Sequence, residues 1–340
     1  MSLGVAGPSD AGSRGSDTSE VTQMAGAPSA RNNLHNEGVQ RSWPIVLVDD
    51  WSVAGLESQG RHPHNWLKHH SQQRTWLFKP ARPTRDRSVG EDVVEKIASE
   101  LARVIGIPAA PVELAVRHGV RGALVEDVRL PNWELQAGQA LIPEVVPDYD
   151  PDDPEQRGYN IETIRQALTR FATPPGSTLP AAFRAFDAFA GYLVFDALIA
   201  HGDRHDRNWA VLVPPLASDD VEALCPSFDH AASLGFTLTD EKRAQLLRDG
   251  TVQRWANRGK AYRFEHRARS HWQTLVDLAA SAVSVCDSGT RDYWRLRVQA
   301  VNAESVMGLV AAAPELSEIA RRFITELIMV NRGRLLDVLC

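Results

Sequence analysis

The sequence predicts an α+β protein with a strand-rich first part and a mainly helical second part. Short apolar runs that are typical of strands occur between residues 43 and 128, and amphipathic patterns that are typical of helices follow from residue 161 to residue 339. A third observation concerns a polar loop at 201–209, which lies between a long apolar helix pattern and a short apolar strand pattern. We therefore expect a small β-rich lobe followed by a larger helical lobe.

The composition is that of an ordinary globular protein. Of the 340 residues, 43% are hydrophobic and 24% are charged, and the formal net charge is −6. The acidic balance argues against nucleic acid and against an anionic membrane surface as partners. Cys225, Cys286 and Cys340 form no Cys-x-x-Cys pair, which favours reduced thiols, and no apolar run reaches the length of a membrane span. We expect a soluble, cytoplasmic protein.

The amino-terminal segment differs in composition from the rest of the chain. Residues 1–40 are rich in Gly, Ser, Ala, Asp and Asn and contain hardly any large apolar side chains. Such a segment cannot bury enough surface to offset the entropy of ordering, so we expect a disordered tail. The β-rich lobe is then expected at 41–130 and the helical lobe at 131–340. Within the helical lobe, the acidic and proline-rich run Pro147–Glu155 is expected to be a solvated insertion.

The individual elements follow from apolar periodicity. In the first lobe we expect one helix at Val94–Ile105, stopped by Gly106 and Pro108, and strands at Trp76–Phe78, Val112–Arg117 and Ala123–Val128. In the second lobe we expect helices at Ile161–Phe171, Ala181–Ala200, Thr239–Arg248, His266–Val285 and Glu315–Leu339. A strand is expected at Ala210–Val213, and a second one is expected to end at Asp229.

The polar loop reads His201-Gly-Asp-Arg-His-Asp-Arg-Asn-Trp209. Phosphoryl transfer needs an aspartate that orients the attacking hydroxyl and accepts its proton, and an asparagine and a second aspartate that hold Mg²⁺ against the phosphates of ATP. Asp203, Asn208 and the downstream Asp229 have this spacing. The alternative is a solvated turn, in which these residue types are also common. The long apolar helix before the loop and the strand after it favour the catalytic interpretation.

An upstream lysine and glutamate fit the same chemistry. Lys79 stands near the end of the apolar run Thr75–Pro80, and a lysine at a strand end can reach the α- and β-phosphates of ATP. Glu95 lies near the edge of the apolar face of the predicted helix, from which it could turn toward Lys79. A surface lysine and a solvated glutamate are the alternatives.

Four motifs then occur in an order that indicates a family. They are Trp-Leu-Phe-Lys-Pro, Gly-Glu-Asp-Val-Val-Glu-Lys-Ile-Ala, Ala-Leu-Ile-Ala-His-Gly-Asp-Arg-His-Asp-Arg-Asn-Trp and Ser-Phe-Asp-His-Ala-Ala-Ser-Leu-Gly. Over about residues 43–250 the chain resembles the HipA-like kinase family, and its Asp-Arg-His-x-x-Asn core is similar to the phosphatidylinositol 3-/4-kinases. The resemblance implies a bilobal protein-kinase-like fold with a small β-rich N-lobe and a larger, mainly helical C-lobe.

The resemblance also implies a role for each candidate residue. Lys79 would bind the phosphates of ATP, and Glu95 would pair with Lys79. Asp203 would be the catalytic base, and Asn208 and Asp229 would be the ligands of Mg²⁺. The second aspartate is followed by His-Ala-Ala instead of Phe-Gly, which is unlike typical eukaryotic protein kinases.

Two further features are implied in the same way. His205 would position the catalytic loop instead of carrying a proton. Gly55 and Gly60 would belong to a phosphate-binding loop at Ser52–Arg61, where glycine lets backbone amides approach an anion. Ser52-Val-Ala-Gly is similar to the HipA loop in which a serine can be autophosphorylated, although a plain turn explains it equally well.

The expected activity is ATP- and Mg²⁺-dependent phosphotransfer to a protein Ser/Thr hydroxyl. The resemblance also allows an inhibitory partner protein, since antitoxins inhibit HipA relatives. Several alternatives stay open: a small-molecule kinase of the aminoglycoside or choline type, whose loop resembles His-Gly-Asp-x-His-x-x-Asn; a phosphoinositide kinase; transfer of AMP; and a catalytically silent nucleotide-binding module. The sequence does not name the acceptor.

Overall fold

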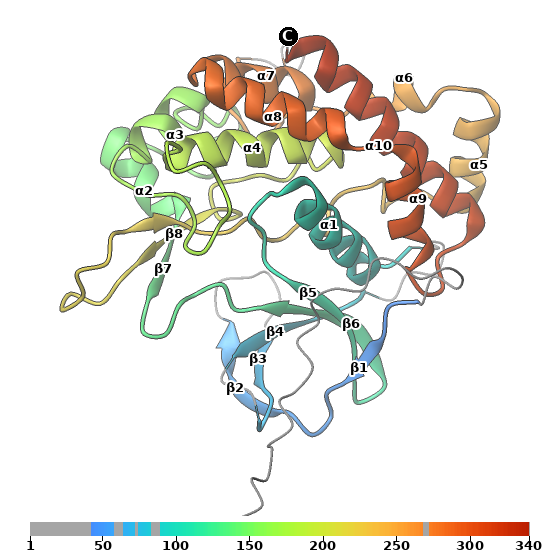
Figure 1. Ribbon diagram of the computed structural model, residues 1–340, viewed down its shortest axis with the longest axis horizontal. Coiled ribbons are helices and arrows are strands. Elements are labelled where there is room, and N and C mark those ends of the chain that lie inside the picture. The colour runs from blue at the N-terminus through green and yellow to red at the C-terminus, as the bar shows by residue number, and fades with distance from the viewer. Residues whose placement is uncertain (1–41, 58–63, 72–73, 83–88, 268–271, 340) are drawn as a thin grey trace, which may run out of the picture. The chain divides into compact units, whose positions relative to one another are not determined.

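A computed structural model gives the structure of the protein for residues 42–57, 64–71, 74–82, 89–267 and 272–339 (Figure 1). These residues all belong to one compact unit. Along the chain, a six-stranded sheet with helix α1 comes first, and a mainly helical lobe with a three-stranded sheet follows. The α+β class that the sequence predicts is therefore confirmed.

The first lobe is built on the six-stranded sheet. Its strands are β1 (Ile45–Leu47), β2 (Ser52–Glu57), β3 (His64–Lys68), β4 (Thr75–Pro80), β5 (Val112–Arg117) and β6 (Val120–Glu126). Their order in space is β1-β5-β6-β4-β3-β2, with β1 parallel to β5 and all other neighbours antiparallel. The three strands that the sequence predicts in this lobe are present as β4, β5 and β6. The sequence does not predict β2 and β3, because their residues lack a clear alternation of polar and apolar types.

Strand pairing decides which way Lys79 faces. Lys79 lies opposite Ala123 in the register of β4 with β6. Alternate residues of a strand share one face of the sheet, so Lys79 is on the same face as Leu77. That face packs against Phe228 of the second lobe. The strand therefore presents Lys79 toward the boundary between the lobes.

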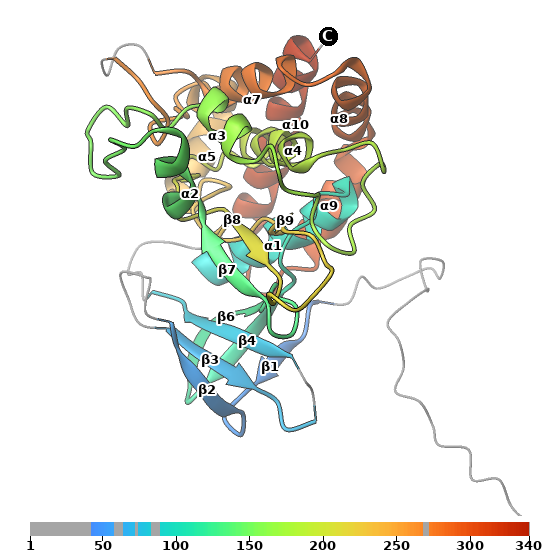
Figure 2. The same ribbon diagram turned by 90° about the vertical axis from the view of Figure 1, so that its left-hand side faces the viewer.

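Helix α1 (Glu91–Ile105) lies between the sheet and the helical lobe, as Figures 1 and 2 both show. Glu91 and Asp92 in its first turn complement the positive end of the helix dipole. Gly106 ends the helix in the left-handed conformation, at φ +83°. The buried apolar face is made by Val93, Val94, Ile97, Ala98, Leu101, Ala102 and Ile105. Glu95 is also buried, so the helix can bring a carboxylate under the sheet.

The second lobe packs its helices around α4. Its elements are β7 (Glu134–Ala137), α2 (Gly138–Val145), α3 (Ile161–Ala167), α4 (Ala185–Leu198), β8 (Ala210–Val213), β9 (Ala223–Leu224), α5 (Asp240–Arg248), α6 (Val252–Ala256), α7 (Leu275–Ser284), α8 (Ser288–Ala300), α9 (Ala303–Ala311) and α10 (Glu318–Val338). Every residue of α4 except Asp187 is buried, which is typical of a helix that is apolar on all sides and enclosed by others. Helices α7, α8 and α10 contact it.

Several boundaries differ from the prediction for local reasons. The strand that was expected to end at Asp229 is the short β9, which stops before Pro226, a residue without an N–H for the ladder. The helix expected from His266 begins only at Leu275, because Thr274 caps its first turn. Helix α8 is absent from the prediction, since it buries only Thr290, Trp294 and Val298.

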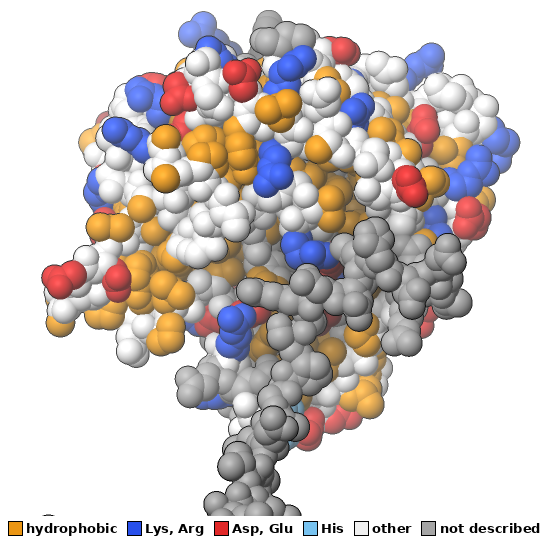
Figure 3. All heavy atoms as spheres, in the orientation of Figure 1, with side chains coloured by type: hydrophobic (Ala, Val, Ile, Leu, Met, Phe, Trp, Pro, Cys, Tyr) orange, Lys and Arg blue, Asp and Glu red, His pale blue; other side chains and the backbone are white. Residues whose placement is uncertain are grey.

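The connection between β8 and β9 projects from the second lobe (Figure 1). Leu216 and Val221 on this connection are exposed. Figure 3 shows apolar and acidic side chains together at this edge of the molecule. None of the helices in the described part of the chain is long and apolar enough to cross a membrane.

Gly191 on α4 faces Trp294 on α8 with no room for a larger residue. A Cβ atom at Gly191 would lie 2.1 Å from Cζ2 of Trp294. We expect Gly191→Ala to lower the free energy of unfolding by about 2 kcal/mol, because overpacking a dense core costs about 1–3 kcal/mol. Urea denaturation measures this change.

Gly333→Ala on α10 is the matched control. No described atom lies within 4 Å of the Cβ position at Gly333. Alanine favours a helix over glycine by about 1 kcal/mol, so this variant should be at least as stable as the wild type. Equal losses in both variants would contradict the close packing at Gly191.

Candidate active site

The loop that carries Asp203 begins where α4 ends. The N–H of His201 donates to the carbonyl oxygen of Asp196 at 2.7 Å. The N–H of Ala200 donates to the carbonyl oxygen of Ala197 at 3.4 Å, and Ala200 has a φ of +56°. This pair of bonds is the Schellman arrangement, which commonly ends helices and usually has glycine at the left-handed position. The turn directs the chain from the helix straight into the loop.

Arg204 anchors this loop from inside the protein. Its side chain is only 2% exposed, and its Nε and Nη2 donate to the two carboxylate oxygens of Asp196 at 2.8 and 2.7 Å. Its Nη1 donates to the carbonyl oxygen of Asn208 at 2.6 Å. A buried ion pair needs good geometry and further hydrogen bonds to offset desolvation, and the bidentate contact provides that geometry. Arg204 near the start of the loop and Asn208 near its end are thus both connected to Asp196 on α4.

The same guanidinium group reaches the segment before Asp229. Its Nη2 donates to Oγ of Ser227 at 2.9 Å, and this hydroxyl lies 2.7 Å from Nε2 of His230. Burial holds the pKa of His230 well below its usual range. The neutral ring can therefore accept a hydrogen bond from Ser227. One buried cation holds the two loops that carry Asp203 and Asp229.

Backbone and amide contacts shape the interior of the loop. The carbonyl oxygen of Asp203 accepts from Nδ2 of Asn208 at 2.8 Å and from the N–H of His205 at 2.9 Å. Nδ1 of His205 accepts from the N–H of Arg207 at 3.1 Å. The buried Asn208 is thereby oriented, because its nitrogen is engaged and its Oδ1 is the end that can accept or ligate.

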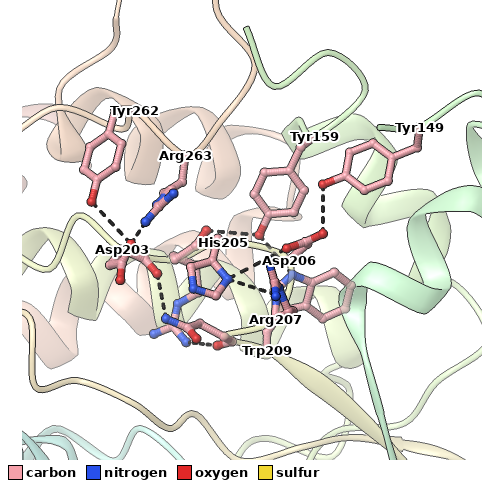
Figure 4. Close-up of polar contacts among 11 residues, drawn as sticks. Tyr149, Tyr159, Asp203, His205, Asp206, Arg207, Trp209, Tyr262 and Arg263 are labelled. Atoms are coloured by element: carbon pink, nitrogen blue, oxygen red, sulfur yellow. Dashed lines mark hydrogen bonds and ion pairs between the residues drawn. The ribbon is translucent and has the colours of Figure 1, made fainter. Parts of the chain in front are cut away.

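The carboxylate of Asp203 contacts two side chains from the segment after α6. Nε of Arg263 donates to its Oδ1 at 2.6 Å, and the hydroxyl of Tyr262 donates to the same oxygen at 3.3 Å. Figure 4 shows both side chains pointing at Asp203 from the same side. Tyr262 and Arg263 are not predicted from the sequence, since they lie about sixty residues downstream in a segment without a motif.

Lys79 joins the two lobes through two carboxylates. Its Nζ donates to Oε1 of Glu95 on α1 at 3.0 Å and to Oδ1 of Asp229 in the second lobe at 2.8 Å. Glu95 is 2% exposed. Asp229 has a left-handed backbone at φ +61°, an uncommon conformation for a residue other than glycine. The structure thus brings together three of the residues that the sequence singles out.

Burial and charge act in opposite directions on this group. Burial by itself would lower the pKa of Lys79, but the carboxylates of Asp229 and Glu95 outweigh it and hold that pKa above its usual value. The ammonium group of Lys79 in turn holds the pKa of Asp229 well below its usual range. Burial raises the pKa of Glu95, and Lys79 offsets only part of this. At neutral pH, Lys79 and Asp229 are both charged.

The donor atoms at this site fit magnesium. Asn208 and Asp229 offer an amide and a carboxylate oxygen, and Mg²⁺ is usually bound through one or two carboxylates, water and substrate phosphates. In the described ranges, no cluster of three or more His, Cys, Asp or Glu side chains could hold a metal alone. A magnesium ion here would take its remaining ligands from bound nucleotide and water.

The glycine-containing segment is only partly described. Gly55 lies on β2 beside a register irregularity between Val53 and Gly55. No described atom lies within 4 Å of a Cβ placed there, so the space above this glycine is open. Ser52 is exposed at the start of β2, and its Oγ donates to the carbonyl oxygen of Lys68 at 3.2 Å. Gly60 lies outside the described residues.

The buried pair of Asp196 and Arg204 can be tested by removing one charge. We expect Asp196→Asn to lower the free energy of unfolding by about 3–5 kcal/mol, because Arg204 becomes an uncompensated buried cation. The measurement is a denaturant titration followed by tryptophan fluorescence.

Glu162→Gln is the matched control on the surface. It removes one charge from the pair of Glu162 and Arg165, whose side chains are 54% and 44% exposed. Exposed pairs contribute about 0–1 kcal/mol, so this variant should change little. A loss at Asp196 no larger than the loss at Glu162 would rule out the anchoring role of Arg204.

Comparison with solved structures supports the fold. The structure of a proinflammatory kinase from Helicobacter pylori, CtkA, matches with a TM-score of 0.64 and 13% identity, covering 87% of this chain and 97% of that one. This match confirms the bilobal kinase-like fold. A chain of the Shewanella oneidensis MR-1 complex of HipA, HipB and operator DNA matches with a TM-score of 0.47 and 11% identity, over 89% of this chain and 66% of that one.

None of the curated proteins matches the chain. The expectation that nucleic acid is not a partner stays a prediction from the net charge.

The model of the HipA-like C-terminal domain matches residues 51–289, which is more than half of the chain. The family that the motifs indicate is thereby confirmed, and the chain belongs to the HipA-like kinase family.

Proposed function

We propose that this protein is an ATP- and Mg²⁺-dependent kinase that transfers the γ-phosphate to a Ser or Thr hydroxyl of a protein. The arrangement of Lys79 with Glu95 at 3.0 Å and with Asp229 at 2.8 Å carries the proposal. A lysine held by a helix glutamate next to a metal-binding aspartate is the arrangement that kinases use on nucleotide phosphates. Membership of the HipA-like family supports a protein as the acceptor.

Each residue of the site would have a separate role in binding ATP and Mg²⁺. The ammonium group of Lys79 would contact the phosphates of ATP, and Glu95 would keep the lysine in place from α1. Asn208 and Asp229 would hold Mg²⁺, whose positive charge offsets the charge on the phosphates. His205 would hold the loop in shape through its contact with Arg207. Gly55 would lie near the phosphates.

Transfer of the γ-phosphate to the acceptor would occur in one direct displacement. The acceptor oxygen attacks the γ-phosphorus and forms a new P–O bond, while the bond from the γ-phosphorus to the bridging oxygen breaks. The electron pair of that bond leaves with ADP, and the hydroxyl proton passes to the carboxylate of Asp203. Arg263 and Tyr262 both use Oδ1 of Asp203. Among the described residues none donates to Oδ2, so this oxygen can face the acceptor.

The role of Asp203 can be separated from nucleotide binding. We expect Asp203→Asn to lower the transfer rate by about 10²–10⁴-fold, the contribution of a positioned general base, and to leave the affinity for nucleotide almost unchanged. Transfer is measured with γ-labelled ATP and intact mass, and binding is measured by calorimetry. Wild-type transfer in this variant would contradict the assignment of the base.

Asp229→Ala should have the opposite pattern. It removes a ligand of Mg²⁺, so it should weaken Mg²⁺-dependent binding of ATP itself. Unchanged binding would remove Asp229 from the metal site. Tight nucleotide binding by the wild type without any transfer would instead favour a silent binding module.

A further inference from the structure

A cavity of about 790 Å³ opens beside the candidate base. Its lining includes Gly202, the residue before Asp203. It also includes Tyr262 and Arg263, the two side chains that bond to the carboxylate of Asp203. All of its lining comes from the second lobe, between Pro154 and Leu275. The cavity therefore approaches Asp203 from the helical lobe, whereas Lys79 approaches the nucleotide site from the sheet.

The charge of this cavity contrasts with that of the whole chain. Arg258, Lys260 and Arg263 line it, in a protein of net charge −6. Glu155 also lines it, but its carboxylate lies 3.5 Å from Arg157. Within the part of the chain that the structure describes, Arg258 and Lys260 form no ion pair. Two cations without a carboxylate partner create a local positive potential that attracts an anionic ligand.

The cations stand on a fixed backbone. The N–H of Ala261 donates to the carbonyl oxygen of Gln273 at 3.0 Å, and the N–H of Leu275 donates to that of Gly259 at 3.3 Å. Lys260 and Thr274 form an antiparallel bridge between these bonds. This pairing holds the segment of Lys260 against the start of α7, so the backbone that carries the two cations has a defined place beside the cavity.

We propose that this cavity receives the acceptor and selects a peptide segment in which acidic side chains lie close to the Ser or Thr that is modified. The inference rests on the proposed function and adds the substrate class. The acceptor hydroxyl would lie at Asp203, and acidic residues next to it would pair with Arg258 and Lys260. The aromatic rings of Tyr262 and Trp272 would cover the peptide between these points. The volume is in the range of about 300–1,000 Å³ that ligand pockets have, which leaves room for a short peptide stretch.

The first test compares peptide sets with one central serine. The full-length protein, Mg²⁺ and γ-labelled ATP are incubated with peptides whose flanking residues are Asp and Glu, with matched peptides in which these are Asn and Gln, and with peptides flanked by Lys and Arg. We expect the acidic set to be labelled with at least about tenfold higher kcat/KM than the neutral set, and the basic set to be the poorest.

Charge reversal in the cavity provides the second test. We expect Lys260→Glu and Arg258→Glu each to raise KM for the acidic peptides by about tenfold and to lower KM for the basic peptides. The matched control is Arg254→Glu on α6. Arg254 is exposed, as Arg258 is, and forms no ion pair among the described residues, but it does not line the cavity. A purely structural role of Lys260 would not exchange one peptide preference for the other.

The outcomes separate this inference from the proposed function. Equal labelling of the acidic, neutral and basic sets would overturn the peptide class while leaving a working kinase. A KM for acidic peptides that is the same in Lys260→Glu and wild type would overturn the assignment of the cavity. Labelling of no peptide set and of no protein, the kinase itself included, would overturn the proposed function and this inference with it.

Discussion

The buried ion pair between Arg204 and Asp196 joins three parts of the second lobe: the end of α4, the loop of Asp203 and the segment before Asp229. Because α4 is enclosed on all sides, it offers a rigid base for this pair. The guanidinium group remains protonated at every accessible pH, so the contacts that it makes do not depend on titration. The relative positions of these three parts thus depend on one buried side chain.

Lys79 places a second constraint on the site, this time between the lobes. Its one ammonium group is shared between Glu95 and Asp229, which lie 3.0 and 2.8 Å away. In the proposed function, nucleotide phosphates would compete with Asp229 for the lysine. The contact between Lys79 and Asp229, which joins the two lobes, is therefore the one that nucleotide binding would change.

Periodicity and spacing predict the parts of the fold that depend on local sequence. The strand of Lys79 is predicted correctly because its residues form a short apolar and aromatic run, and the helix of Glu95 is predicted correctly because its apolar residues recur at helical spacing. The contact of Glu95 with Lys79 is implied only by the family resemblance, because periodicity places Glu95 at the edge of the apolar face, where a solvated position is an alternative. In contrast, the anchoring role of Arg204 has no sequence signal, since a buried arginine in a polar motif looks like a solvated one. Arg263 reaches Asp203 only through the packing of the second lobe, and spacing along the chain does not encode such a contact.

The left-handed backbone of Ala200 has a consequence for substitutions at this residue. A left-handed backbone at φ +56° costs an L-residue about 1–2 kcal/mol, whereas glycine adopts it freely. Glycine would also widen the range of directions in which the turn can send the loop of Asp203. Glycine at residue 200 would therefore relieve the strain of the turn and at the same time restrict the turn less, so the stability of the turn and the position of the loop of Asp203 make opposite demands on this residue.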